Sequence, residues 1–263
     1  MNRVAFLLLL GLLLVVVWPV QGQTPTTADD YYNRGIARGK AGYLEGAIAD
    51  FSKVIEMEPL SAQAYYNRGY ARHLTKDLDG ALADYAKYIE LEPRDPDGYN
   101  NRGNVRRAKG DFDGAIADLN KVIEIDSRYA KAYYNRGFTL EAKGDPDRAI
   151  ADYTKSIELE PLDADVYGKL AWLLATTSRD AIRDGKKAVE YAGKAAELTK
   201  WEDANTLDTL AAAYAEAGNF DEAIKWENKA LSFPEFAKSN GDQARKRLQL
   251  YTERKPYHEP PPK

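Results

Sequence analysis

The pentapeptide Tyr31-Tyr32-Asn33-Arg34-Gly35 decides the fold, because nearly the same five residues return at a fixed interval. The sequence reads YYNRG at 31–35, YYNRG at 65–69, YNNRG at 99–103 and YYNRG at 133–137, a spacing of 34 residues. A period of this length is typical of one helix-turn-helix unit copied along a chain, and such units stack into a solenoid. The sequence therefore predicts an all-α fold whose function lies on a surface and not in a catalytic pocket.

Other positions keep the same phase when each unit is numbered from 1, starting at Ala28. Place 8 is glycine and place 20 is alanine in the first four units, which lets two helices approach closely. Place 24 carries a large side chain, namely Phe51, Tyr85, Leu119 or Tyr153. Proline at place 32 of most units stops the second helix. This pattern resembles the tetratricopeptide repeat (TPR) family.

The resemblance implies a right-handed superhelical solenoid that ends in a capping helix. The predicted divisions are 28–61, 62–95, 96–129 and 130–163 as regular repeats, 164–203 as a divergent fifth repeat, 204–237 as a sixth, and 238–263 as a capping helix and proline-rich tail. Two departures stand out. Lys76 replaces the turn glycine of the other units, which predicts a differently shaped turn, and the fifth unit is six residues longer than the others.

The first 22 residues differ in kind from the repeats. Arg3 precedes an apolar run, and Val20-Gln21-Gly22 suits a cleavage site, so residues 1–22 are predicted to be a secretory signal peptide, followed by a linker at 23–27. An uncleaved N-terminal anchor is the alternative, because the apolar run is near the shortest length that spans a bilayer. Either interpretation places the repeats in an extracytoplasmic space, periplasmic or secreted.

Composition argues against catalysis and against nucleic acid. The chain has no cysteine and only two histidines, which leaves little material for a zinc site or a nucleophilic triad. No enzyme activity, cofactor or metal is expected. The formal net charge is -4 with the signs interleaved, whereas a nucleic-acid partner requires a basic face.

Place 6 is asparagine in the first four units and supplies the binding hypothesis. In TPR solenoids the first helices line a concave groove, and the resemblance implies that such an asparagine ladder holds an extended peptide by its backbone. An amide side chain both donates and accepts hydrogen bonds, which suits a peptide group. The alternative is that these amides hold water or tie helix to helix. The ladder consists of Asn33, Asn67, Asn101 and Asn135.

Aromatic side chains flank this ladder at places 5 and 9. They are Tyr32, Tyr66, Tyr70, Tyr134, Phe138 and Trp172. Rings at helical spacing serve packing more often than ligand binding, yet an aromatic groove could also stack on sugar rings. The predicted partner is therefore a protein or extended peptide of unknown identity. Polysaccharide handling or envelope assembly is the alternative function, and pairing with a second copy is left open.

Arginine at place 7 is unusual, and an aspartate follows it 16 residues later in each regular unit. This spacing predicts structural ion pairs between the two helices of a unit, with an anionic ligand as the alternative partner of the arginines. The pairs are Arg34 with Asp50, Arg68 with Asp84, Arg102 with Asp118, and Arg136 with Asp152.

The C-terminal segment is predicted to cover the last repeat. Ala244, Leu248 and Tyr251 share one helical face, and the basic residues around them, Arg247 among them, are expected on solvated faces. The tail after His258 is expected to be an exposed polyproline-type end without a fold of its own.

Overall fold

The computed structural model describes residues 25–260, and within that range it contains fourteen α-helices and no strand. The first twelve helices form six consecutive pairs. These are α1 (Ala28–Lys40) with α2 (Leu44–Met57), α3 (Ala62–Leu74) with α4 (Leu78–Leu91), α5 (Pro96–Ala108) with α6 (Phe112–Ile125), α7 (Ala130–Lys143) with α8 (Pro146–Leu159), α9 (Ala164–Thr176) with α10 (Gly185–Leu198), and α11 (Ala204–Glu216) with α12 (Phe220–Leu231). The prediction of an all-α repeat fold is confirmed.

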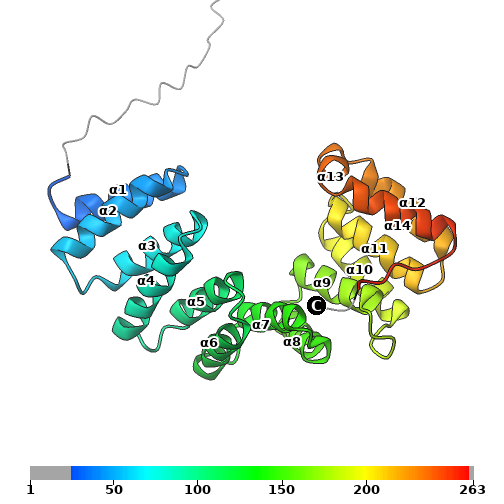
Figure 1. Cartoon of the computed structure of the whole chain (residues 1–263), viewed down its shortest axis with the longest axis horizontal. Coiled ribbons are helices and arrows are strands. Elements are labelled where there is room, and N and C mark those ends of the chain that lie inside the picture. The colour runs from blue at the N-terminus through cyan, green and yellow to red at the C-terminus, as the bar shows by residue number, and fades with distance from the viewer. Residues whose placement is uncertain (1–24, 261–263) are drawn as a thin grey trace, which may run out of the picture.

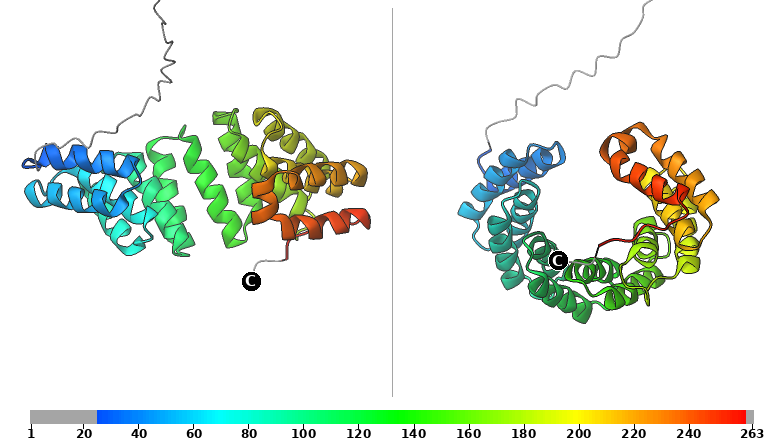
Figure 2. Two further views of the ribbon diagram at one scale, coloured as in Figure 1. Left: turned by 90° about the horizontal axis from the view of Figure 1, so that it is seen from above. Right: turned by 45° about the vertical axis from the view of Figure 1, so that its right-hand side comes forward.

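The helix pairs follow one another around an open ring (Figure 1; Figure 2). The first helix of each pair lies on the inner side of this ring and the second on the outer side. Successive first helices such as α1 and α3, or α3 and α5, contact each other, as expected on the inner side of a curve. The predicted signal peptide, residues 1–22, lies outside the described residues. Among the helices that are described, none is both long and apolar enough to cross a membrane.

Short acidic side chains fix where the second helices begin. Asp77, Asp111 and Asp145 each accept a hydrogen bond from the backbone N–H three residues further on. Such a cap satisfies a backbone donor that has no partner inside the helix and stabilises the helix by about 1 kcal/mol. The second, third and fourth units thus carry the same start signal, whereas the first unit has Tyr43 at this place without a side-chain cap.

The turn between the two helices uses one residue in the left-handed conformation. Gly42, Gly110 and Gly144 have φ angles of 81°, 80° and 84°. Lys76 takes the same role with a φ of 68°, so the prediction of a differently shaped turn in the second unit is wrong. The packing of the two helices fixes the path of the turn, and the lysine adopts a conformation that glycine would adopt without strain.

Each pair closes around a small residue that faces a ring. A Cβ added to Gly35 would lie 2.8 Å from the ring of Phe51, and one added to Gly137 would lie 2.9 Å from Tyr153. Ala47 and Ala149, on the second helices, are completely buried beside these contacts. The small residues at places 8 and 20 therefore set the distance between the helices, and the ring at place 24 fills the space next to them.

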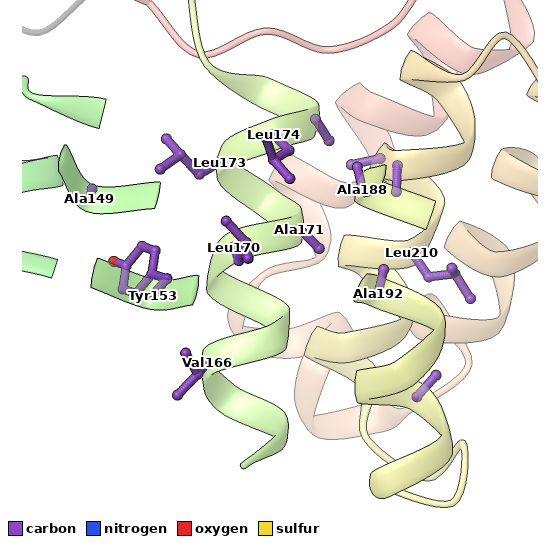
Figure 3. Packing of buried hydrophobic residues seen from close by; sticks show 14 of the residues in the cluster. Ala149, Tyr153, Val166, Leu170, Ala171, Leu173, Leu174, Ala188, Ala192 and Leu210 are labelled. Atoms are coloured by element: carbon purple, nitrogen blue, oxygen red, sulfur yellow. The ribbon is translucent and has the colours of Figure 1, made fainter. Parts of the chain in front are cut away.

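The fifth unit carries the largest apolar cluster. Figure 3 shows Val166 and Leu170 on the side of α9 toward α8, and Ala171 on the side toward Ala192 of α10. The extra residues of this unit form the longer connection between Thr176 and Gly185. The insertion therefore lengthens a loop and leaves the helices of the stack in place.

Two further helices end the array, α13 (Pro234–Ser239) and α14 (Gly241–Thr252). The predicted division between residues 237 and 238 falls inside α13. Ala244 and Tyr251 of α14 are completely buried against the sixth unit. A terminal helix with one apolar face is what a solenoid needs to cover its last repeat.

Arg247 of α14 corrects one expectation. The expected solvated face is wrong for this residue, because it is 7% exposed and its guanidinium lies 2.5 Å from Asp208 and 3.4 Å from Glu227. Burial raises the pKa of Glu227, and the charge of Asp208 raises it further. Two buried acids facing one arginine thus attach the capping helix to α11 and α12.

Candidate binding groove on the inner face

The inner face of the ring is hollowed at several points along its length. One hollow of about 540 Å³ is lined by residues of α7, α9, α11 and α14, including Tyr134, Gly168 and Trp172. A second, of about 440 Å³, lies between α7 and α9 beside Phe138. A third, of about 160 Å³, lies between α1 and α3 and includes Asn67 and Tyr70. Three separate hollows, lined mainly by first helices, thus lie along the concave side.

The four arginines at place 7 are held by the aspartates of the second helices. Their guanidinium groups lie between 2.5 and 2.7 Å from a carboxylate oxygen, and Nε donates a second hydrogen bond to the same side chain. Two parallel bonds of this kind orient both side chains. The bonded pairs are Arg34 with Asp50, Arg68 with Asp84, Arg102 with Asp118, and Arg136 with Asp152.

A second arginine joins three of these pairs and was missed from the sequence. Arg38, Arg72 and Arg106, at place 11, lie 3.0, 2.8 and 2.8 Å from the same aspartates. The spacing of four residues between the two arginines puts them on one helical face, and this signal could have identified them. In the fourth unit Leu140 occupies place 11, so Asp152 is bonded to Arg136 alone among the described residues.

The arginines also connect neighbouring units. Arg68 donates to the hydroxyl of Ser52 at 3.0 Å, and Arg136 donates to Asn120 Oδ1 at 2.7 Å, in each case to the preceding unit. The guanidinium carbon of each place-7 arginine lies over the ring of the place-4 tyrosine in the same unit, 5.3 to 5.7 Å from the ring centre. The guanidinium groups of these arginines therefore already have partners inside the protein. Few of their donors are left for an anionic ligand.

The asparagine ladder ties one unit to the next. Asn67 Nδ2 donates to the hydroxyl of Tyr32 at 3.0 Å, and Asn101 Nδ2 donates to that of Tyr66 at 2.8 Å. Asn135 Nδ2 donates to Asn100 Oδ1 at 2.8 Å. This geometry matches the alternative that the amides join helix to helix.

The first rung differs. Asn33 is exposed, and among the described residues its side chain donates to no group. The fifth unit carries Lys169 at the same place. The ladder is thus continuous only from the second to the fourth unit.

Most of the flanking rings are half-buried against the core. Tyr32 packs edge-on against Phe51 with ring centres 5.8 Å apart, and burial raises the pKa of Tyr66 and of Tyr134. Tyr70 is the exception, because it is 52% exposed on the inner helix α3. The polysaccharide alternative requires open ring faces, and the rings at place 5 have little such surface.

The chain's own C-terminal segment lies at the edge of this inner face, across the C-terminal ends of α9 and α11, which corrects the expectation of a free tail. The backbone N–H of Glu259 donates to the carbonyl of Thr176 at 2.7 Å, and its carboxylate accepts from Trp172 Nε1 at 2.7 Å. His258 lies 2.7 Å from Glu216 at the end of α11. In Figure 2 this segment lies inside the ring in the right-hand view and at its lower edge in the left-hand view. Residues 261–263 lie outside the described residues.

This arrangement defines a class of protein, a helical repeat solenoid with a hollowed inner face. Family models match three stretches, one described as TPR repeat over residues 103–144 and two as tetratricopeptide repeat over residues 130–162 and 32–99. The chain is a tetratricopeptide repeat protein. No curated protein matches its sequence. TPR folds generally serve as non-catalytic scaffolds for protein interaction.

Solved structures share the fold at low sequence identity. PilF of Pseudomonas aeruginosa is 20% identical, with 83% of this chain and 97% of that chain covered and a TM-score of 0.67. YrrB, described as a TPR protein with an unusual peptide-binding site, is 22% identical, with 76% and 98% covered and a TM-score of 0.58. MamA is 24% identical, with 64% and 95% covered and a TM-score of 0.56.

Proposed function

We propose that this protein is a non-catalytic scaffold that holds an extended segment of a partner protein on its concave inner face. The observation that carries the proposal is the position of its own C-terminal segment. Glu259 is bound to the inner helix α9 through its main chain and through its carboxylate, which are the two kinds of contact that an extended peptide ligand would make. The same wall continues into the hollow of about 540 Å³, where a longer ligand has room.

The peptide-binding site named for YrrB, which shares the fold, supports the same proposal. The asparagine ladder contributes in a narrower way than the sequence suggested. Its amide nitrogens are used between units, so a bound chain would meet carbonyl oxygens that accept from peptide N–H groups.

The experiment uses two glycines whose surroundings are open. A Cβ on Gly168 or on Gly193 meets nothing within 4 Å, but Gly168 lines the inner hollow and Gly193 lies on the outer helix α10. Gly168→Phe should block the groove, while Gly193→Phe adds the same ring outside it. Affinity capture with both variants and the wild-type chain should yield a partner that only Gly168→Phe loses, at equal helix content by circular dichroism.

Capture of the same partner by all three proteins would reject the inner face as the binding surface. A partner lost only by Gly193→Phe would place binding on the outer helices instead.

We also propose that the repeats act in an extracytoplasmic space, on the strength of the apolar N-terminal run. N-terminal sequencing of the protein from that fraction should begin at Gln23. Recovery of the protein only in the cytoplasm would reject export, whereas a membrane-bound chain that retains Met1 would show an anchor.

A further inference from the structure

The last described residues of the chain form a short extended segment at the edge of the inner face. Within residues 256–260, Tyr257 and Glu259 are half-buried, whereas His258 and Pro260 are exposed. Side chains of an extended chain point alternately to its two sides, so this alternation is typical of a segment with one side against the protein. We call residues 256–260 the strap.

The strap bonds to a carbonyl that the helices leave without a partner. The carbonyl of Thr176, at the end of α9, accepts from the Glu259 N–H at 2.7 Å and, among the described residues, from no other group. The carbonyl of the next residue, Thr177, is already bonded to Arg183 at 2.9 Å. Thr176 is completely buried, so loss of the strap without a replacement would leave a buried acceptor unpaired.

The aromatic residue of the strap packs on a surface that other contacts hold in position. The ring centres of Tyr257 and Trp172 are 6.2 Å apart, and the guanidinium carbon of Arg247 lies 5.8 and 5.4 Å from them. Arg247 is fixed by ion pairs with Asp208 and Glu227, so its position does not depend on the strap. The surface is thus a preformed site for one aromatic side chain.

A small set of polar contacts holds the strap against the freedom of a chain end. Its contacts of 2.7 Å are the main-chain bond of Glu259, the bond from Trp172 Nε1 to the Glu259 carboxylate, and the contact of His258 with Glu216. Glu216 is also paired with Arg183 at 3.0 Å, so it keeps a partner without the strap. Ordering a chain end costs conformational entropy, which offsets much of what such contacts contribute. The strap can therefore leave when another segment takes over its contacts.

We propose, resting on the proposed function, that the strap is a built-in competitor of the partner, and that the partner segment binds by replacing it at Thr176 and Trp172. The replacing segment is extended, because it has to bring a main-chain N–H to the Thr176 carbonyl. It carries an aromatic side chain two residues before that N–H, where Tyr257 now packs on Trp172. The strap thus limits access to the inner face and indicates the pattern of the partner that fits there.

The test uses full-length protein and a fluorescent peptide with the sequence of residues 255–260 and blocked ends. An apparent affinity falls in proportion to the fraction of protein whose site is open. Glu259→Pro removes the N–H and the carboxylate together and should release the strap. Fluorescence polarisation should show this variant binding the peptide about tenfold more tightly than the wild type, as for a wild-type site that is open about one-tenth of the time. Lys255→Gln, at an exposed residue just before the strap, should bind like the wild type.

Two altered peptides test how the segment is recognised. One has proline in place of the glutamate and lacks the donor for Thr176, and the other has alanine in place of the tyrosine. Each should bind the Glu259→Pro variant about tenfold more weakly than the original peptide. Adding Trp172→Phe to this variant keeps a ring but removes Nε1, so it should also weaken the original peptide.

A second measurement needs no substitution. In the wild-type chain, hydrogen exchange at the Glu259 amide should be slow and should become faster as the peptide is added, because the strap leaves when the peptide enters. A Glu259 amide that stays protected while the peptide binds would overturn the inference.

Equal affinity of the original peptide for the wild type and for Glu259→Pro, at equal helix content by circular dichroism, would also overturn it. The same holds if Glu259→Pro does not bind the peptide at about 1 mM, which is the effective concentration of a segment on a short linker. Equal binding of the original and the altered peptides would reject the proposed pattern.

Capture of the partner separates this inference from the proposed function. Glu259→Pro should capture more partner than the wild type, and Gly168→Phe should capture none. A partner lost by Gly168→Phe but captured equally by Glu259→Pro and the wild type would keep groove binding and overturn the role of the strap. Groove binding itself is judged by Gly168→Phe and Gly193→Phe alone, so the two failures are distinguishable.

Discussion

Asp152 and Asp118 are buried carboxylates in equivalent positions, but they differ in their cationic partners. Asp118 is held by both Arg102 and Arg106, while Asp152 is held by Arg136 alone among the described residues. We expect Arg136→Ala to lower the unfolding free energy by about 3 kcal/mol, because it leaves a buried charge unpaired. Arg102→Ala should cost only about 1 kcal/mol, since Arg106 remains. Urea denaturation measures both.

Arg94→Ala, in an exposed loop, is the control for these substitutions and should leave the unfolding free energy unchanged within about 0.5 kcal/mol. Equal losses at Arg102 and Arg136 would show that the second arginine contributes nothing to holding the aspartate.

Lys76 carries strain that a glycine would remove. Its φ of 68° lies in the left-handed region, where the other units place glycine. We expect Lys76→Gly to raise the unfolding free energy by about 0.5 to 1 kcal/mol, the relief of strain minus the added chain entropy of glycine. Thermal unfolding should show a higher midpoint for this variant, and a lower one for Thr75→Gly, whose φ is -81°. A fall in the midpoint of Lys76→Gly would contradict this account of the turn.

Within the helices of this chain, glycines occur in two different environments, one crowded and one open. An added Cβ on Gly137 would lie 2.9 Å from Tyr153 and 3.2 Å from the backbone oxygen of Ala149, while one on Gly193 meets nothing within 4 Å. Gly137→Ala should therefore destabilise the fourth pair by about 1 to 3 kcal/mol. Gly193→Ala should stabilise α10 by about 0.5 to 1 kcal/mol. Calorimetry that finds the same sign for both would refute the close-contact argument.

The attachment of α14 predicts a dependence of stability on pH. Burial and the charge of Asp208 raise the pKa of Glu227 above its unfolded value of 4.5. The folded state therefore holds a proton that the unfolded state has lost, so this contribution is complete below about pH 4.5 and is lost as the pH rises toward the folded pKa. Within that window, stability should fall by at most about 1.4 kcal/mol per pH unit.

Glu227→Gln removes this titration. Its unfolding free energy should depend less on pH between about 5 and 8 than that of the wild-type chain, and Glu190→Gln, on an exposed residue of α10, should follow the wild type. Parallel curves for Glu227→Gln and the wild type would show that the buried acid does not govern the capping helix.

Across the whole molecule, the helices and the Arg–Asp pairs were predictable from the sequence, because the same residue pattern recurs in four units. What the sequence could not show were contacts between segments far apart in the chain that occur only once. Arg247 looked solvated because its partners Asp208 and Glu227 belong to other helices. The tail looked free because nothing local marks Trp172 as the partner of Glu259.

On the inner face, residues at the same place of the repeat can have different functions, and a periodic sequence pattern does not distinguish them. An asparagine that bonds to the preceding repeat and one that faces a ligand occupy the same place, so the spacing alone leaves both interpretations open. Arg107 and Lys169 were missed for another reason: they occupy places 12 and 6 of different units, and no spacing in the sequence marks that both lie near the ring of Phe138.

The most direct test of groove binding is site-specific photo-crosslinking. Tyr70 on the inner helix α3 and Met57 on the outer helix α2 are similarly exposed, at 52% and 49%. A benzophenone side chain in place of each, in separate full-length proteins, samples the two faces with matched access. The account predicts that the captured partner crosslinks from position 70 and not from position 57. Crosslinking from position 57 alone would contradict it and move the binding surface to the outside of the ring.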